Sequence, residues 1–455
     1  MLSSPFKSHA MNSLEKFFPS IPSTLTHMPY WTMEKVDESI KNFGYYTHNN
    51  PGAEKNIPEF DRKFAGWIAM SNEGREELRR FGARKPIHVA YPPTAFNYQP
   101  MKVMVVGAEQ PNGRKDTGIL LDLLWKNPHL IKSLSFLIIG TGWKDEVQKL
   151  ANLGAFVAHV EKVDVIPYGE CDVLLSTGFV EGGPLPVLEA LAAGKRVLTP
   201  KYGVGADILE GEFLYDSVQE LAERLTELVL VRKKRCALVE SFTPHNYQRG
   251  ITNFIERVCN LPASTRYGTL VREVRESRAK KILEIGVYQG TTAQDIIEAA
   301  QESMGEVYYT GVDLFELTSE EKEKEFSKFP SPIEAVLKRL RSTGASIQLL
   351  KGNSYEKVKK LEGPFDLIFV DGGHSWETIE KDWNSIQHLI GEGTIVIFDD
   401  YYPYYEDDLY GIGCQKLLRG LDDNIWNVEL LQPGEVWPQS FGELTIHMAK
   451  VTKRG

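Results

Sequence analysis

Three aspartates near the C-terminus stand where carboxylates could bind a cation. Asp371 follows the apolar run "FDLIFV", and Asp399 and Asp400 follow "GTIVIF". These runs predict buried strands, and open parallel sheets bind ligands at the carboxyl ends of their strands. Three clustered carboxylates would repel one another without a cation, and such hard oxygen donors suit Mg²⁺. His374, three residues after Asp371, adds an imidazole that can exchange a proton near neutral pH.

A second group of candidate residues surrounds a glycine turn. The segment "LEIGVYQGTTA" gives the pattern Glu284-x-Gly286-x-x-x-Gly290 between a predicted strand and a predicted helix. Glycines there let the backbone approach a ligand, and the helix N-terminus adds amide donors. A turn needed only for packing is the other interpretation. The next strand ends in Asp313, where an acid can accept both hydroxyls of a nucleoside ribose, and Asn353 follows a third strand.

The first half of the chain carries a pair of glutamates at a fixed spacing. Glu181 and Glu189 are separated by seven residues in "EGGPLPVLEALAAG". In a helix that follows the glycines, this spacing places both carboxylates near one open end of a sheet. Upstream, the segment "GRKDTG" contains the basic pair Arg114 and Lys115.

The elements that must position these residues form two α/β blocks. The first begins at "MKVMVVGAE" (residues 101–109), and the second contains "KKILEIG", "VYYTGVD", "ASIQLLKG", "FDLIFVD" and "GTIVIFDD". Short apolar runs between amphipathic stretches predict two doubly wound Rossmann-like domains in tandem. The segments "NVELLQP" and "GELTIHMAKVT" predict a C-terminal antiparallel hairpin. "NLPASTRYG" (residues 260–268) interrupts the periodicity, so we expect a domain boundary there.

Composition narrows the class of protein. The chain has 455 residues, which predicts two or three domains, and 42% apolar with 25% charged residues is ordinary for a globular protein. A net charge of −10 disfavours nucleic-acid binding. The cysteines Cys171, Cys236, Cys259 and Cys414 are scattered, which fits a reducing cytosol. No apolar run reaches the length of a transmembrane helix, so we expect a cytoplasmic location.

The second block resembles the class I S-adenosylmethionine-dependent methyltransferases, from about residue 267 to the end. The resemblance implies that Gly286 and Gly290 border the cofactor and that Asp313 holds its ribose; Glu284 and Asn353 belong to the same expected site. Within this class, the C-terminal motifs resemble the metal-dependent O-methyltransferases, including the caffeoyl-CoA and macrolide-sugar types.

That second resemblance assigns roles to the opening residues. It implies that Asp371, Asp399 and Asp400 bind one divalent ion, expected to be Mg²⁺, which lowers the pKa of the acceptor hydroxyl. His374 is the expected general base. The other interpretation is that the acids cap helices and that the histidine is a surface group.

The first block resembles the GT-B glycosyltransferases that carry an E-x7-E signature. The resemblance implies that Arg114 and Lys115 contact the nucleotide diphosphate, that Glu189 holds its ribose, and that Glu181 holds the donor sugar and takes part in catalysis; it favours a retaining reaction. Gly183 stands where the family has an aromatic residue. Only about a hundred residues precede the block, so the acceptor half is truncated or supplied by a partner; His27 and His48 are possible remnants of its loops, and a degenerate scaffold is the other interpretation.

Together these patterns predict a bifunctional enzyme that builds and methylates a glycan. Expected domains are a partial acceptor-side region (1–100), a nucleotide-sugar-binding GT-B-like domain (101–259) and a methyltransferase domain (268–455). Expected ligands are S-adenosylmethionine, a divalent metal, a nucleotide-diphosphate sugar and a glycan acceptor. The alternatives are an O-methyltransferase whose first module only binds nucleotide or glycan, a natural-product tailoring methyltransferase, and a non-catalytic assembly protein, which the intact acidic residues disfavour.

Overall fold

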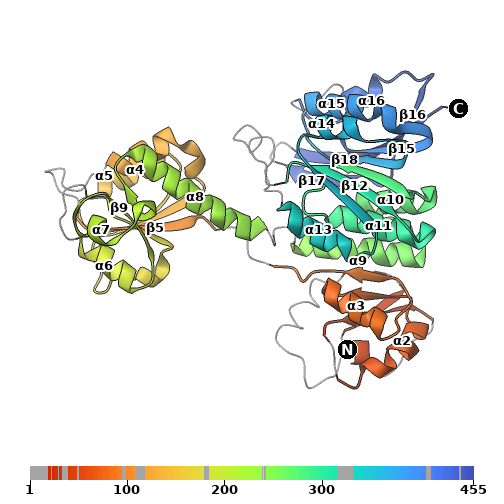
Figure 1. Cartoon of the computed structure of the whole chain (residues 1–455), viewed down its shortest axis with the longest axis horizontal. Coiled ribbons are helices and arrows are strands. Elements are labelled where there is room, and N and C mark those ends of the chain that lie inside the picture. The colour runs from red at the N-terminus through yellow and green to blue at the C-terminus, as the bar shows by residue number, and fades with distance from the viewer. Residues whose placement is uncertain are drawn as a thin grey trace. The chain divides into compact units, whose positions relative to one another are not determined.

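The chain folds into two compact units (Figure 1). The computed structural model describes residues 19–21, 23–28, 30–32, 39–48, 51–94, 99–108, 118–178, 184–237, 239, 242–315, 331–405, 411–439 and 442–454. Unit 1 combines residues 1–95 with residues 237–455, and unit 2 consists of residues 96–236. Along the chain, unit 2 is therefore inserted into unit 1.

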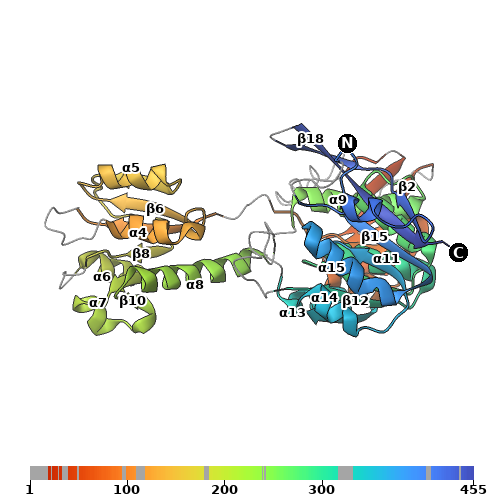
Figure 2. The ribbon, with the colours of Figure 1, turned by 90° about the horizontal axis from the view of Figure 1, so that it is seen from above.

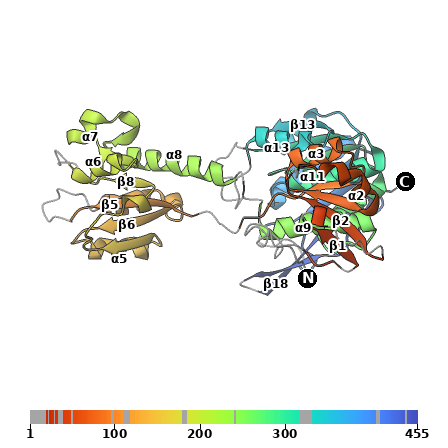
Figure 3. The ribbon, with the colours of Figure 1, turned by 90° about the horizontal axis from the view of Figure 1, so that it is seen from below.

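Unit 2 contains a six-stranded parallel sheet with the strand order β10-β9-β8-β5-β6-β7. Figure 3 shows β8, β5 and β6 side by side. The strands are β5 (Met101–Val106), β6 (Leu134–Ile139), β7 (Phe156–Val160), β8 (Val173–Leu175), β9 (Arg196–Pro200) and β10 (Leu214–Tyr215). The helices are α4 (Gly118–Lys126), α5 (Lys144–Asn152), α6 (Leu185–Ala192), α7 (Gly203–Ile208) and α8 (Val218–Ala237). The predicted doubly wound α/β pattern of this block is confirmed.

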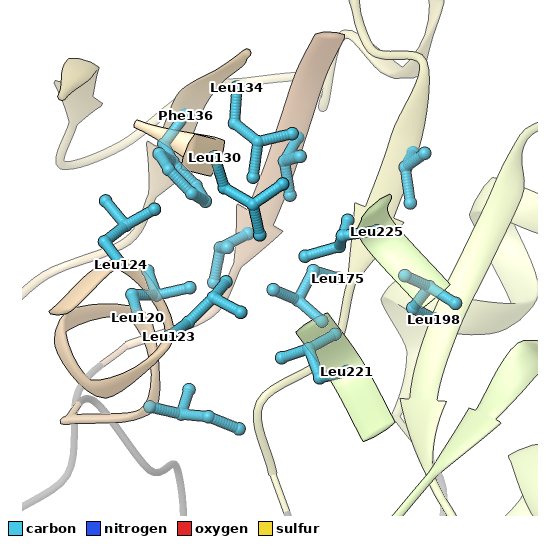
Figure 4. Close-up of a cluster of buried hydrophobic side chains, with 14 of the residues drawn as sticks. Leu120, Leu123, Leu124, Leu130, Leu134, Phe136, Leu175, Leu198, Leu221 and Leu225 are labelled. Carbon is cyan, nitrogen blue, oxygen red and sulfur yellow. The ribbon is translucent and has the colours of Figure 1, made fainter. Parts of the chain in front are cut away.

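The main core of unit 2 lies where α4 and α8 pack on the sheet (Figure 4). Leu120, Leu123 and Leu124 of α4 are fully buried, and their helical spacing places them on one face. Leu221 and Leu225 of α8 are also buried in this cluster. This apolar packing fixes the helices against the strands whose carboxyl ends carry the predicted donor-site residues.

Unit 1 contains an eight-stranded mixed sheet with the order β13-β12-β11-β14-β15-β18-β16, in which β17 also pairs with β18. The strands are β11 (Lys281–Ile285), β12 (Tyr308–Asp313), β13 (Ser346–Lys351), β14 (Phe365–Val370), β15 (Ile390–Tyr401), β16 (Trp426–Leu430), β17 (Glu435–Gln439) and β18 (Gly442–Lys453). The helices are α10 (Arg266–Ser277), α11 (Thr291–Met304), α13 (Ile333–Arg341), α14 (Ser354–Lys357), α15 (Trp376–Ile386) and α16 (Gln415–Arg419). Strand order reverses between β11 and β14, which is where open α/β sheets bind ligands.

The C-terminal antiparallel hairpin is confirmed. β18 runs antiparallel to β15, β16 and β17. Figure 2 shows the β18 ribbon running out beyond the other strands of its sheet. The part of β18 that pairs with β17 therefore forms an extension of the sheet next to the end of β15.

Unit 1 also contains a small parallel sheet from the N-terminal region, with the order β1-β2-β3-β4. Its strands are β1 (Thr24–His27), β2 (Lys41–Tyr46), β3 (Gly66–Ala69) and β4 (Ile87–Val89), accompanied by α2 (Ile57–Lys63) and α3 (Asn72–Arg80). The Ser71 hydroxyl caps α3 by accepting a hydrogen bond from the Gly74 amide. The sequence patterns did not reveal β1 and β2.

Helix α9 (Pro244–Cys259) joins the small sheet to the rest of unit 1. Phe254 packs against Phe43 of β2, and the Tyr247 hydroxyl lies 2.7 Å from the Tyr45 hydroxyl. α9 also contacts α10. The structural division at residue 237 therefore differs from the expected boundary at residues 260–268, because α9 buries its apolar side chains inside unit 1.

Candidate functional site

The glycine turn after β11 has a geometry that only glycine allows. Gly286 has φ +90°, and a Cβ there would lie 1.9 Å from the carbonyl oxygen of Asp371. Gly290 has φ +74°, and a Cβ there would meet the Val336 side chain at 2.9 Å. Gly286 thus lets the ends of β11 and β14 approach each other, whereas the contact at Gly290 is one of packing against α13.

Asp313 holds the glycine turn in place through its carboxylate. One carboxylate oxygen accepts hydrogen bonds from the Val287 amide at 2.8 Å and the Tyr288 amide at 2.7 Å. The other oxygen accepts from the Phe315 amide at 2.9 Å. Burial raises the pKa of Asp313, although these amide donors favour the charged form. The Leu314 amide also bonds to this carboxylate, so backbone amides from both loops surround Asp313.

Two further expected cofactor residues flank this turn. Glu284 is buried in β11, where one carboxylate oxygen accepts a hydrogen bond from the Tyr309 hydroxyl. The other oxygen has no hydrogen-bond partner among the described residues. Burial raises the pKa of Glu284 to about 8. Asn353 stands at the N-terminus of α14, two residues after β13, which pairs with the Asp313 strand.

The structure places the three C-terminal aspartates at the ends of neighbouring strands. Val370 of β14 pairs with Phe398 of β15 in a parallel ladder. Asp371, directly after Val370, therefore lies beside Asp399 and Asp400, which follow Phe398 near the end of β15. Asp399 accepts hydrogen bonds from the Arg266 guanidinium and, at 3.0 Å, from the Tyr267 hydroxyl. We call Asp371, Asp399 and Asp400 the acidic cluster.

His374 contacts this cluster directly. Its Nδ1 lies 2.5 Å from Oδ2 of Asp400. The His374 side chain is 43% exposed, whereas that of Asp400 is 14% exposed. The imidazole therefore stands at the rim of the cluster, with Asp400 orienting it from the inside.

The three carboxyl groups of the acidic cluster differ in the direction and cause of their pKa shifts. Burial, followed by the charges of Asp399 and Asp400, raises the pKa of Asp371 well above its ordinary value. Burial raises the pKa of Asp399 to about 6, although Arg266 opposes the shift. Burial would also raise the pKa of Asp400, but its hydrogen bond and charge interaction with His374, together with Arg266, lower it overall.

Arg266 and Tyr267 are site residues that the sequence patterns did not reveal. They begin α10, which is capped by the Thr265 hydroxyl. Arg266 is buried, and its Nε also pairs with Glu435 at 3.3 Å. The segment "NLPASTRYG" indicated only an interruption of the periodicity, and nothing in it indicated a partner more than a hundred residues away.

The acidic cluster and the charged residues paired around it together carry more negative than positive charge. Asp371, Asp399, Asp400 and Glu435 contribute four acids, whereas Arg266 contributes one fixed cation. His374 adds a second positive charge only when it is protonated. At least two negative charges are thus unbalanced when all four acids are ionised. This excess fits a divalent cation.

A different group of side chains has the tightest metal-like arrangement among the described residues. His88, Asp295 and Glu298 offer ligand atoms within 4.8 Å of one another, which the acidic cluster does not. Arg75 pairs with Glu298 at 3.1 Å, and Nδ1 of His88 lies 3.3 Å from the same carboxylate. We interpret this group as a buried ion-pair network that joins β4 and α3 to α11, because the arginine already supplies the positive charge.

The predicted donor site in unit 2 is described only in part. Arg114, Lys115 and Glu181 lie outside the described residues, so only Glu189 can be placed. Glu189 lies on α6 and accepts a hydrogen bond from the Tyr168 hydroxyl at 2.6 Å. Burial and this carboxylate raise the pKa of Tyr168.

The two histidines considered as remnants of acceptor loops lie in unit 1. Nε2 of His27 lies 2.9 Å from the Asn42 side-chain oxygen, and the His27 ring stacks on Phe64. His48 packs its ring edge against Trp31. His27 is a buried component of the small sheet, so its surroundings account for it without a ligand.

Comparison with protein families identifies two domains. Residues 283–401 match the family described as "Methyltransferase domain", and residues 102–230 match the family described as "Glycosyl transferases group 1". The two matches cover the glycine turn with the acidic cluster and the sheet of unit 2, respectively. Both resemblances seen in the sequence are confirmed at this level.

Individual relatives are distant. An uncharacterized protein, R132, from Acanthamoeba polyphaga mimivirus is 29% identical over 66 residues, which cover 13% of this chain and 30% of that protein. The chain thus spans less than a third of the length of this curated relative.

The similar solved structures include transferases of both kinds. A putative O-methyltransferase from Klebsiella pneumoniae is 18% identical, with 44% of this chain and 86% of that chain covered and a TM-score of 0.29. An O-methyltransferase from Bacillus cereus in complex with SAH is 18% identical, with 44% and 89% covered and a TM-score of 0.30. The lipopolysaccharide outer core galactosyltransferase WaaB is 18% identical, with 48% and 68% covered and a TM-score of 0.26.

Glycosyltransferase and methyltransferase domains therefore co-occur in this chain, which supports an enzyme. No described helix combines the length and the apolar character that crossing a lipid bilayer requires.

Proposed function

We propose that this chain is a bifunctional glycan-modifying enzyme whose unit 1 methylates a sugar hydroxyl and whose unit 2 uses a nucleotide-diphosphate sugar. The observation that carries the methyltransferase part is the edge of the eight-stranded sheet. There the glycine turn of β11 lies against Asp371, the first member of the acidic cluster. A cofactor-binding turn beside an acceptor-binding group of charged residues is the arrangement that group transfer requires.

S-adenosylmethionine is the expected methyl donor. The glycine turn follows β11 and Asp313 ends β12, the neighbouring strand, so both lie at the carboxyl edge of the sheet, where an acid can accept ribose hydroxyls. Glu284 and Asn353 border the same site. When bound, the cofactor supplies an electrophilic methyl group. The chain's own part is to fix the cofactor's position relative to the acceptor.

A divalent metal is the expected partner of the acidic cluster. The negative charge excess and the hard carboxylate ligands fit Mg²⁺ held by Asp371, Asp399 and Asp400. Such an ion would supply Lewis-acid stabilisation of a developing alkoxide. Arg266 and Tyr267 would then orient Asp399 by donating hydrogen bonds to its carboxylate, as carboxylate ligands generally require.

His374 is the proposed general base. With Nδ1 held by Asp400 at 2.5 Å, Nε2 is the ring nitrogen that takes the proton of the acceptor hydroxyl. An anionic partner at Nδ1 stabilises the imidazolium that results. The exposed position of His374 suits an acceptor that approaches from solvent, as one end of a glycan would.

A second candidate function keeps the methyltransferase and makes unit 2 a binding module without transfer activity. The small N-terminal sheet favours this candidate. A transferring enzyme of this kind needs an acceptor-binding domain beside unit 2, but the described N-terminal residues form a four-stranded sheet that packs within unit 1 against α9. The two candidates share the donor site, in which Arg114 and Lys115 contact phosphates, Glu189 holds the ribose and Glu181 holds the sugar. They differ only in whether sugar is transferred.

A ligand panel tests these proposals. S-adenosylmethionine and nucleotide-diphosphate sugars should each raise a melting transition of the full chain, because ligands that bind the folded state stabilise it by mass action. Glu181→Ala serves as the control for the sugar donor. Binding without transfer to any acceptor supports the second candidate, and the absence of nucleotide-sugar binding refutes the donor site in both.

A further inference from the structure

The β17–β18 hairpin reaches the acidic cluster through one side chain. Glu435, the first residue of β17, accepts a hydrogen bond from Nε of Arg266 at 3.3 Å. The same guanidinium donates through Nη1 to Asp399. The beginning of β17 is therefore one side chain away from the residues proposed to activate the acceptor.

The strand pattern turns Trp437 to the same face as Glu435. Alternate residues of a strand share one face, and Glu435 and Trp437 are two residues apart. In the antiparallel ladder they pair with Ile446 and Leu444, whose side chains pack on Tyr402. Tyr402 follows Asp400 by two residues, so this face is the one nearest the end of β15. Val436 lies on the opposite face and is 56% exposed.

Trp437 is a large aromatic side chain that stays accessible. It is 39% exposed although the His245 ring packs edge-on against it at 5.6 Å. His245 is in the first turn of α9, and Arg249, one turn further, lies over the Tyr267 ring at 4.2 Å. The Tyr267 hydroxyl in turn donates a hydrogen bond to Asp399. Helix α9 therefore contacts Trp437 through His245 and the acidic cluster through Arg249 and Tyr267.

We propose that Trp437, with His245, forms a subsite for a sugar ring one step beyond Glu435, next to the ring that is methylated. The C–H face of a pyranose carries partial positive charge and suits the negative face of an indole. A hydroxyl of the same ring can pair with the His245 imidazole, which packs against the indole. This subsite rests on the proposed sugar methyltransferase and specifies its acceptor.

The spacing of the strand indicates the length of that acceptor. Two residues of a strand span about 7 Å, so Trp437 stands one sugar-sized step beyond Glu435. A single sugar placed at the acidic cluster would leave the indole uncovered. The acceptor is therefore an oligosaccharide of at least two units, and a monosaccharide is a poorer substrate.

Substitution of Trp437 tests the subsite. Trp437→Ala should raise the KM for an oligosaccharide acceptor about tenfold, the factor expected when an aromatic contact is lost. The change for the matched monosaccharide should be smaller, and kcat and the affinity for S-adenosylhomocysteine should stay near parental values. Trp437→Phe keeps an aromatic face and should recover most of the loss. Val436→Ala, on the opposite face, is the matched control.

Each other result overturns a defined part of this inference. An unchanged oligosaccharide KM in Trp437→Ala refutes the subsite while the methyltransferase proposal stands. If Trp437→Ala raises the KM for phenolic acceptors more than the KM for glycans, the subsite does not bind a sugar ring. If the parent methylates no sugar, calorimetric titration of oligosaccharide into protein loaded with S-adenosylhomocysteine decides the subsite separately: equal affinity in parent and Trp437→Ala refutes it.

Discussion

Replacing Asp371 by Asn removes one of three neighbouring negative charges while keeping the size of the side chain. Burial and the charges of Asp399 and Asp400 raise the pKa of Asp371 well above its ordinary value. An acid with a raised folded-state pKa contributes stability that is fully present below the unfolded pKa and is lost as the pH rises through the folded pKa. Without metal, Asp371→Asn should therefore stabilise the protein at pH 8 and have a smaller effect at pH 5.

The neighbouring Asp399 carboxyl also has a raised pKa. Its pKa lies at about 6 instead of 3.8. A shift of this size corresponds to about 3 kcal/mol of unfavourable free energy for the ionised form. The shift of Asp371 has the same direction and the same leading cause, so Asp371→Asn should raise the free energy of unfolding at pH 8.

Denaturant unfolding in EDTA at pH 5 and pH 8 measures the difference. A chain of two units is not expected to unfold in one step, so the transition of unit 1 is identified by its shift with S-adenosylhomocysteine. Asp423→Asn, at an exposed carboxylate without an ion pair among the described residues, is the control and should change stability by less than about 0.5 kcal/mol. Lower stability of Asp371→Asn at pH 8, or an equal change at both pH values, would refute the charge-excess argument.

Three further substitutions test individual roles. Asp313→Ala should weaken S-adenosylmethionine binding by roughly 1.5–3 kcal/mol through loss of hydrogen bonds to a charged acceptor, and unchanged affinity in calorimetry contradicts that role. His374→Ala should slow methyl transfer by roughly 10²–10⁴-fold with little change in cofactor affinity, and a parental rate excludes it as the base. Arg266→Met leaves the buried Asp399 without its cation and should lower the free energy of unfolding by about 3–5 kcal/mol at pH 8. The loss should be smaller below pH 6, because Asp399 is then protonated. A loss that does not depend on pH would mean that Arg266 contributes only by packing.

Much of the fold could be predicted because it is encoded locally. Apolar runs separated by amphipathic stretches indicated the parallel strands of both α/β sheets, and the two strands without an intervening helix indicated the antiparallel pair of β16 and β18. Ser71 was identifiable as a helix cap from its position before a helical pattern. The strands β1 and β2 were not predicted, because neither stands out as an apolar run between amphipathic stretches. The amphipathic pattern of α9 predicts a buried face but does not identify the sheet on which that face packs.

In the site too, residues marked by a local sequence pattern could be predicted, whereas residues that contact distant parts of the chain could not. The acids at strand ends could be found because a parallel sheet brings those ends to one edge. Arg266 and Tyr267 could not be found, because their contacts with Asp399 span 133 and 132 residues of sequence. The expectation that only a bound ion balances the acids was therefore incomplete: the chain itself supplies one guanidinium to a group that still carries an excess of negative charge.

Transfer of labelled methyl from S-adenosylmethionine to oligosaccharide acceptors tests the central claim most directly. The assay compares the full chain in EDTA, after restoration of Mg²⁺ or Mn²⁺, and with Asp399→Ala in the presence of metal. We predict label in the sugar fraction only with metal and parental Asp399, while S-adenosylmethionine binding persists in the variant. Full activity in EDTA would contradict the metal, and label entering protein or nucleic acid in preference to glycan would contradict the proposed function.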